Sequence, residues 1–156
     1  MEMALIGSLF SLALLNVGEL GRYAYVSMEA GTATQASVAG ALAACDVAHL
    51  PATSNCAGLD AAVSTAMQGT SLGSAVVLSS SLAEGYYCVS DHQVLTYVST
   101  PASPPTDCTG ANNPSALPAL YLKVATTYTY TPMFPGMTVV DVLPSKILHV
   151  AWTRVK

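Results

Sequence analysis

The sequence predicts an α+β protein in which one long N-terminal hydrophobic α-helix precedes a small antiparallel β-sheet. Residues 3–18 contain no Asp, Glu, Lys or Arg, and no proline interrupts the chain before Pro51. Beyond residue 75, segments rich in Val, Leu, Tyr and Thr alternate with segments rich in Pro, Gly and Ser. We therefore expect a helix over 1–44 and a disulfide-bonded α+β head over 45–156.

The helix is expected to run from about residue 3 to about residue 44. At a rise of ~1.5 Å per residue it would be roughly 60 Å long, which is far more than a bilayer needs. We expect its uncharged leading half in a membrane or in the apolar core of a helical assembly. A secretory signal peptide would begin with basic residues, whereas the first cation here is Arg22. Glu19 lies three residues before Arg22, so the two share a face and partly neutralise each other.

Small residues recur at every fourth position in the second half of this helix. They form two rows, Ala33, Ser37 and Ala41, and Ala36, Gly40 and Ala44. Such rows let helix backbones approach closely, and we expect Ala33, Ser37, Gly40 and Ala41 at contacts between subunits. The alternative is that the rows pack on the chain's own sheet. Both interpretations hold together if different faces are used.

Glu2 places a carboxylate at the head of the apolar helix, where lipid makes an unpaired charge costly. One interpretation puts it in the headgroup layer or at the helix N-terminus, where the helix dipole favours an anion. The other pairs it with an α-amino group at the start of a chain. The residues alone leave both interpretations open.

The composition excludes several classes of function. Charged residues make up 9% of the chain and hydrophobic residues 52%, so we expect lipid or other subunits to cover much of the surface. The net charge is −4, and the few Lys and Arg residues are scattered. Nucleic-acid binding needs grouped cations and is not expected.

The four cysteines predict two disulfides and an oxidising compartment outside the cytoplasm. Cys45–Cys56 and Cys88–Cys108 are the local pairings, although four cysteines allow three connectivities and free thiols are the alternative. A zinc site is not favoured, because no pair has C-x-x-C spacing and the three histidines lie far apart in sequence. We expect no cofactor and no metal.

The head is expected to contain one short helix over 60–68 and four or five strands. The predicted strands cover 75–82, 85–90, 92–100, 120–132 and 146–156. In the fourth of these, Tyr121, Lys123, Ala125, Thr127 and Thr129 share one face, and Leu122, Val124, Thr126, Tyr128 and Tyr130 share the other. The tyrosines of the sheet, taken as a group, favour an interface, since tyrosine has an apolar body and a polar tip.

No reaction can be argued from these residues, and we expect no enzyme. Gly69 to Gly73 matches the G-x-S-x-G nucleophile elbow around Ser71. That elbow needs a strand before the serine and a helix after it, whereas the order expected here is the reverse. His92 and His149 lie in predicted strands, where packing or surface roles are expected.

Four segments of the sequence resemble a known family. M-E-M-A-L at 1–5 and V-G-E-L-G-R at 17–22 are similar to the opening and the helix end of the TadE/TadG-like proteins of tight-adherence pilus systems. The Ala-rich 30–44 and Y-T-Y-T-P-M-F-P at 128–135, followed by a final strand with Arg154, fit as well. The middle of the chain is not matched.

The resemblance implies a pilin-like structural subunit, major or minor, of an extracellular pilus that serves adhesion. It also implies cleavage by a prepilin peptidase, residence in the bacterial inner membrane before assembly, and partners in the pilus assembly machinery and in copies of the chain in a helical filament. Glu2 would be the glutamate that pairs with a neighbour's N-terminal amine, although it is second here and usually fifth in pilins. The alternative function is a single-span inner-membrane protein whose periplasmic domain binds a ligand or scaffolds a complex.

Overall fold

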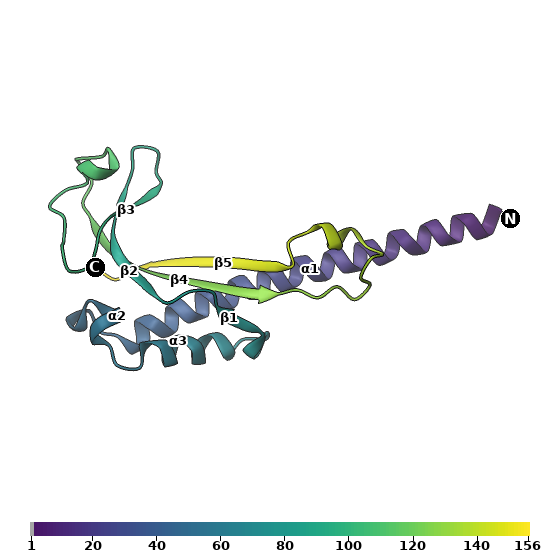
Figure 1. Ribbon diagram of the computed structural model, residues 1–156, viewed down its shortest axis with the longest axis horizontal. Coiled ribbons are helices and arrows are strands. Elements are labelled where there is room, and N and C mark those ends of the chain that lie inside the picture. The colour runs from purple at the N-terminus through teal and green to yellow at the C-terminus, as the bar shows by residue number, and fades with distance from the viewer. Residues whose placement is uncertain (1) are drawn as a thin grey trace.

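The computed structural model describes residues 2–156, except for the side chains of residues 2–5 and 47. One long helix, α1 (Glu2–Ala44), runs through the whole molecule, and the rest of the chain packs on its C-terminal part (Figure 1). The N-terminal end of α1 projects beyond the head without covering. The expected α+β architecture and the length of the helix are confirmed.

The buried side of α1 follows the helical repeat. Val26, Ala30, Ala33, Ser37 and Ala41 are buried and recur at intervals of three or four residues, which places them on one face. Because these side chains are small, sheet and helix backbones approach closely. The core of the head therefore includes the second half of α1 and crosses the boundary expected after residue 44.

The sheet is antiparallel throughout, with β4 at its centre. β5 pairs with β4 along one edge, β1 and β2 follow each other along the other edge, and β3 pairs with β2. The bounds are β1 (Val76–Leu78), β2 (Ala83–Val89), β3 (Leu95–Ser99), β4 (Ala119–Thr129) and β5 (Lys146–Arg154).

Three strand ends differ from the prediction by three residues or more, and one of them is the end of β4, which was expected at 132 and lies at Thr129. The strand expected over 75–82 ends at Leu78, because the chain leaves β4 there and returns to it as β2. The strand expected from 92 begins at Leu95, because residues 91–93 form a turn in which Gln93 has a φ of 60°. Local composition does not distinguish such turns from strand ends.

Helices cover the inner face of the sheet and leave its outer face open. α3 (Leu59–Gln68) lies beside α1, as expected for residues 60–68, and its Leu59 and Val63 pack with Leu122 and Val124 of β4. The alternation predicted for β4 is confirmed: Leu122, Val124 and Thr126 are buried against the helices. The short helices η1 (Val47–His49), α2 (Ala52–Asn55), η2 (Gly73–Ala75), η3 (Thr109–Ala111) and η4 (Val139–Val142) lie in the connections.

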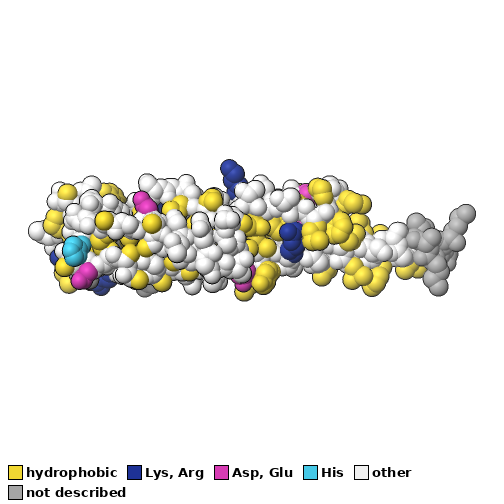
Figure 2. Space-filling view, turned by 90° about the horizontal axis from the view of Figure 1, so that it is seen from below, with side chains coloured by type: hydrophobic (Ala, Val, Ile, Leu, Met, Phe, Trp, Pro, Cys, Tyr) yellow, Lys and Arg dark blue, Asp and Glu magenta, His cyan; other side chains and the backbone are white. Residues whose placement is uncertain are grey.

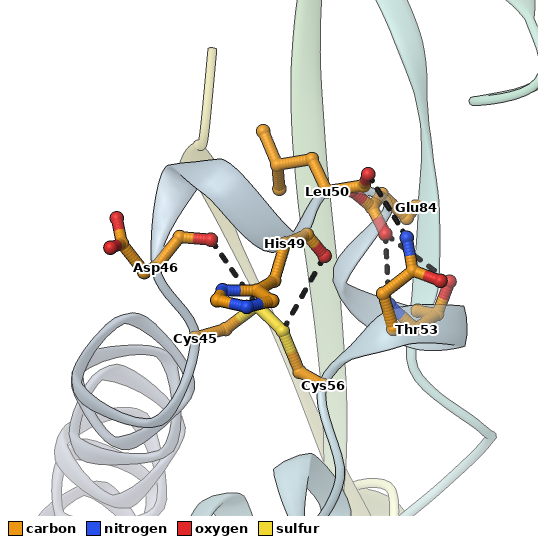
Figure 3. The surroundings of a disulfide bond; sticks show 8 residues. Cys45, Asp46, His49, Leu50, Thr53, Cys56 and Glu84 are labelled. Atoms are coloured by element: carbon orange, nitrogen blue, oxygen red, sulfur yellow. Dashed lines mark hydrogen bonds between the residues drawn. A yellow bond between two sulfur atoms is a disulfide. The ribbon is translucent and has the colours of Figure 1, made fainter.

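Both local disulfides are present. Cys45–Cys56 joins the end of α1 to the residue after α2, and close by the Thr53 backbone N–H and hydroxyl donate to Oε2 of Glu84 on β2 (Figure 3). Cys88–Cys108 is fully buried and joins β2 to the proline-rich loop between β3 and β4. The second bridge therefore anchors a loop that has little core of its own.

Thr34→Val is expected to lower the free energy of unfolding by about 1–2 kcal/mol, because it removes a buried acceptor. The Thr34 hydroxyl donates to the Ala30 carbonyl at 2.8 Å, which leaves the Thr126 hydroxyl to donate to Thr34 at 2.6 Å. Thr34→Val/Thr126→Val removes both groups and should recover much of the loss. Urea unfolding of the four proteins in the cycle measures this coupling; purely additive losses would contradict it.

Candidate assembly surface

The N-terminal part of α1 exposes a wide apolar surface. Residues 6–14 are all exposed, with Ile6 at 62%, Leu9 at 67% and Phe10 at 65% of their full accessibility. Gly7, Ser8 and Ser11 share one side of this segment, and apolar side chains occupy the rest of its circumference. Exposed apolar surface of this extent is normally covered by a partner. This segment is therefore expected to be covered by an apolar partner outside the single chain.

The membrane placement expected for this segment is not supported. Within the described side chains, no helix has both the length and the apolar character that crossing a bilayer requires. Ser8, Ser11 and Asn16 interrupt the apolar run, and Asn16 is followed by the charged pair Glu19 and Arg22.

A second segment of the chain wraps around α1 just after its exposed part. We call residues 130–145, which connect β4 to β5, the collar. The Val139 backbone N–H donates to Oδ1 of Asn16 at 2.7 Å, and the Tyr23 hydroxyl donates to the Pro144 carbonyl at 3.1 Å. These bonds fix the collar against the helix at two separate points.

The collar extends the apolar surface of the helix. Several of its side chains are exposed: Met133, Phe134, Met137, Val139 and Val142. They adjoin Val17 and Leu20 on α1, which are exposed as well. Hydrophobic side chains gather at this end of the molecule (Figure 2). The segment 6–20 and the collar together make one candidate assembly surface, larger than the isolated apolar residues of an ordinary surface.

Glu19 is buried between α1 and the collar and binds collar residues. Its side chain is 1% exposed, and its Oε1 accepts hydrogen bonds from the Tyr130 hydroxyl at 2.5 Å and from the Met133 backbone N–H at 3.0 Å. Oε2 is buried without a hydrogen-bond partner among the described residues. The Tyr130 hydrogen bond lowers the pKa of Glu19; burial opposes it, and the Met133 N–H and the Arg22 charge add to the lowering. Burial is the main cause that raises the pKa of Tyr130, and the hydrogen bond to Glu19 is the second cause.

Arg22 completes this cluster. Its Nη1 lies 3.7 Å from Oε1 of Glu19 and donates to the Thr131 carbonyl at 3.1 Å, and its guanidinium sits 5.1 Å from the centre of the Tyr130 ring. The ion pair expected between Glu19 and Arg22 is confirmed. Two of the four segments that carry the family resemblance, 17–22 and 128–135, thus meet in space.

Acidification is expected to loosen the collar. The pKa of Glu19 is lower in the folded chain than its ordinary value of 4.5, so the folded state binds fewer protons. The stabilisation is complete above that ordinary value and is lost as pH falls through the lowered pKa. Hydrogen exchange of residues 131–145 between pH 6 and pH 3 should show collar protection decreasing.

Two variants make the pH test specific. Tyr130→Phe removes the largest cause of the lowered pKa of Glu19, so the collar should open at a higher pH. Asp141→Asn removes the collar's own carboxylate, which accepts from the Gly136 N–H at 2.7 Å, and should leave the midpoint unchanged. A midpoint that moves with Asp141 instead of Tyr130 would contradict the assignment to Glu19.

The small residues expected at subunit contacts lie inside the chain. Ala33, Ser37 and Ala41 are buried beneath the sheet and α3, with at most 1% of each side chain exposed. Gly40 lies directly against α3. The structure thus shows the alternative, packing on the chain's own elements. The side chain of Glu2 lies outside the described residues, so its two interpretations stay predictions.

The sequence did not indicate Tyr130 and Met133 as partners of Glu19, because more than a hundred residues separate them. The only available signal was a carboxylate on the apolar face of a helix, which demands a buried donor.

The hydrolase-like segment has the order expected from the sequence. Ser71 follows α3 and precedes η2 and β1, and its hydroxyl donates to Oε2 of Glu29 on α1. The side chain of His92 is exposed, and Nε2 of His149 lies 3.4 Å from the Ser27 hydroxyl between β5 and α1. Among the described side chains, no group of three or more His, Cys, Asp and Glu could hold a metal ion.

Comparisons with protein-family models, with curated proteins and with solved structures find no match to this chain.

Proposed function

We propose that this protein is a structural subunit of a pilin-like filament, assembled through the exposed N-terminal part of α1. The observation that carries the proposal is the division of α1 into two parts. Its second half is built into the core of the head, whereas residues 6–14 are mainly apolar and are all exposed. Copies of this segment that pack together would remove that surface from water, at ~25 cal/mol for each Å² buried.

The collar supports the same proposal. It brings five exposed apolar side chains to the base of the projecting helix, where a neighbouring subunit would meet the head. The cluster of buried Glu19 and Tyr130 with Arg22 fastens the collar to α1 at that base. A head fastened in this way to a projecting apolar helix suits a subunit that adds repeatedly to one growing assembly.

The resemblance to the TadE/TadG-like proteins extends the proposal to an extracellular pilus of the tight-adherence type that serves adhesion. The two disulfides agree with an oxidising location. In this proposal the inner membrane holds the subunit before assembly, and a prepilin peptidase and the pilus assembly machinery process and export it.

The test uses the full chain, purified in detergent. After the detergent is removed, wild-type protein should form filaments visible by negative-stain electron microscopy and should sediment. Full-length protein that stays monomeric and folded after detergent removal would overturn the proposal. N-terminal mass spectrometry of protein from its native source reports whether the chain has been cleaved and methylated.

A further inference from the structure

Most cations of this chain lie on the sheet side of the head, and three of its carboxylates lie on the helical side. Apart from Arg22, every Lys and Arg lies on β4, on β5 or at the end of the chain: Lys123, Lys146, Arg154 and Lys156. The helical layer carries exposed or half-exposed carboxylates instead, at Glu29, Asp46 and Asp60. A protein with a net charge of −4 has thus gathered its few cations on one side.

The cationic side is the outer face of the sheet. The strand register pairs Lys123 with Trp152, Tyr121 with Arg154 and Thr129 with Lys146, so these side chains point away from α1. Their neighbours on β5 turn inward, as the contact between His149 and Ser27 shows. We call the outward side chains of β4 and β5 the basic face.

The basic face is also apolar and aromatic. Leu148, Val150 and Trp152 on β5 are 60%, 42% and 38% exposed. The Tyr87 ring lies 4.8 Å from Trp152 and 6.0 Å from Tyr121, and Nζ of Lys123 sits 5.2 Å from the Trp152 ring. Apolar and aromatic side chains bordered by cations form a composition typical of a protein interface.

The acidic side is the helical layer. Glu29 lies on the α3 side of α1, where its carboxylate accepts from Ser71 in the segment after α3. Asp60 is exposed in the first turn of α3, and Asp46 is exposed just after α1 ends. No Lys or Arg other than Arg22 occurs between residues 1 and 122, so this side has little positive charge of its own.

We propose that the basic face of one copy docks on the acidic helical side of the next copy. The proposal rests on the proposed function and names the contact between heads that accompanies contact between the helices. Two different faces of the same chain are used, so the contact is heterologous and repeats into an open filament without closing as a dimer.

Charge complementarity favours a second copy over an anionic lipid surface. The basic face is one side of a molecule whose net charge is negative, so a membrane would repel the remainder of the head. A second copy offers carboxylates on its helical side. Docking these carboxylates against the basic face brings opposite charges together.

Charge reversal tests the docking in the full chain after detergent removal. Lys146→Glu/Arg154→Glu cancels the charge of the basic side, because Lys123 and Lys156 then lie among two new carboxylates, and Asp46→Lys/Asp60→Lys makes the helical side positive. Each variant alone should sediment about tenfold less than wild type, because the first loses the attraction between the two sides and the second replaces it with repulsion. An equimolar mixture of the two should regain wild-type sedimentation, since each variant supplies the face that the other lacks.

Asp91→Lys is the control, because it adds positive charge at the turn between β2 and β3, away from both faces. It should assemble as wild type does. If wild type forms filaments and the reversed variants do so equally, or if the mixture does not recover, the docking is overturned while the proposed function stands. If wild type itself does not assemble, both are overturned. Loss of binding to phosphatidylglycerol vesicles by Lys146→Glu/Arg154→Glu, with filaments unaffected, would assign the basic face to lipid and overturn the docking.

Discussion

Lysine at positions 9 and 10 of α1 is expected to abolish assembly while the head stays folded. Leu9 and Phe10 lie in the exposed segment 6–14, so lysines there remain in water in the single chain and should change its stability by less than about 0.5 kcal/mol. In an assembled apolar core each unpaired charge costs several kcal/mol, so sedimentable protein should fall by at least about a hundredfold.

The control places lysine at an exposed position of the head outside the helical layer. Thr106 is exposed in the loop between β3 and β4, so Thr106→Lys should assemble as wild type does. Circular dichroism of both variants in detergent checks that the head is intact. Filaments from Leu9→Lys/Phe10→Lys in wild-type amounts would show that the exposed segment is not the assembly surface.

The fold could be predicted largely because its elements have strong local signals. An apolar and small-residue run without proline gives α1, and regular alternation gives β4, whose two faces are assigned correctly. The breaks at 79–82 and 91–93 escaped prediction because Ser, His and Gln occur in strands as well as in turns. Their positions depend on how β2 pairs with β4 and β3, which is information distant in sequence.

The candidate site could be predicted only in part. Three-residue spacing was enough to pair Glu19 with Arg22. Composition showed that the leading half of the helix is apolar, but it could not show that the head leaves residues 6–14 uncovered. The position of the collar on α1 could not be predicted from the sequence, because its partners on α1 are more than a hundred residues away.

The small-residue rows were the feature with two open interpretations, since short side chains suit both intermolecular and intramolecular contacts. Burial of Ala33, Ser37 and Ala41 beneath the chain's own sheet and α3 decides where these side chains lie in the single chain. A stability measurement on the detergent-solubilised monomer distinguishes the two roles, because a residue used only between subunits does not affect a monomer.

Gly40→Val is expected to lower the free energy of unfolding of that monomer by about 3 kcal/mol, through overpacking. A Cβ at Gly40 would lie 2.6 Å from the Ala66 Cβ and 2.9 Å from the Ala62 carbonyl oxygen, so α3 must move away from α1. The Ala62 backbone cannot move aside as the end of a flexible side chain could, so the whole of α3 must shift. That shift separates Leu59 and Val63 of α3 from the sheet.

Gly21→Ala is the matched control, because a Cβ at Gly21 meets nothing within 4 Å. The better helix propensity of alanine should then stabilise the monomer by about 0.5–1 kcal/mol, which is the opposite sign. Thermal or urea unfolding of both variants, followed by circular dichroism, measures the difference. If Gly40→Val unfolds like wild type but fails to assemble, α1 and α3 do not pack as described, and the small-residue rows belong to contacts between subunits.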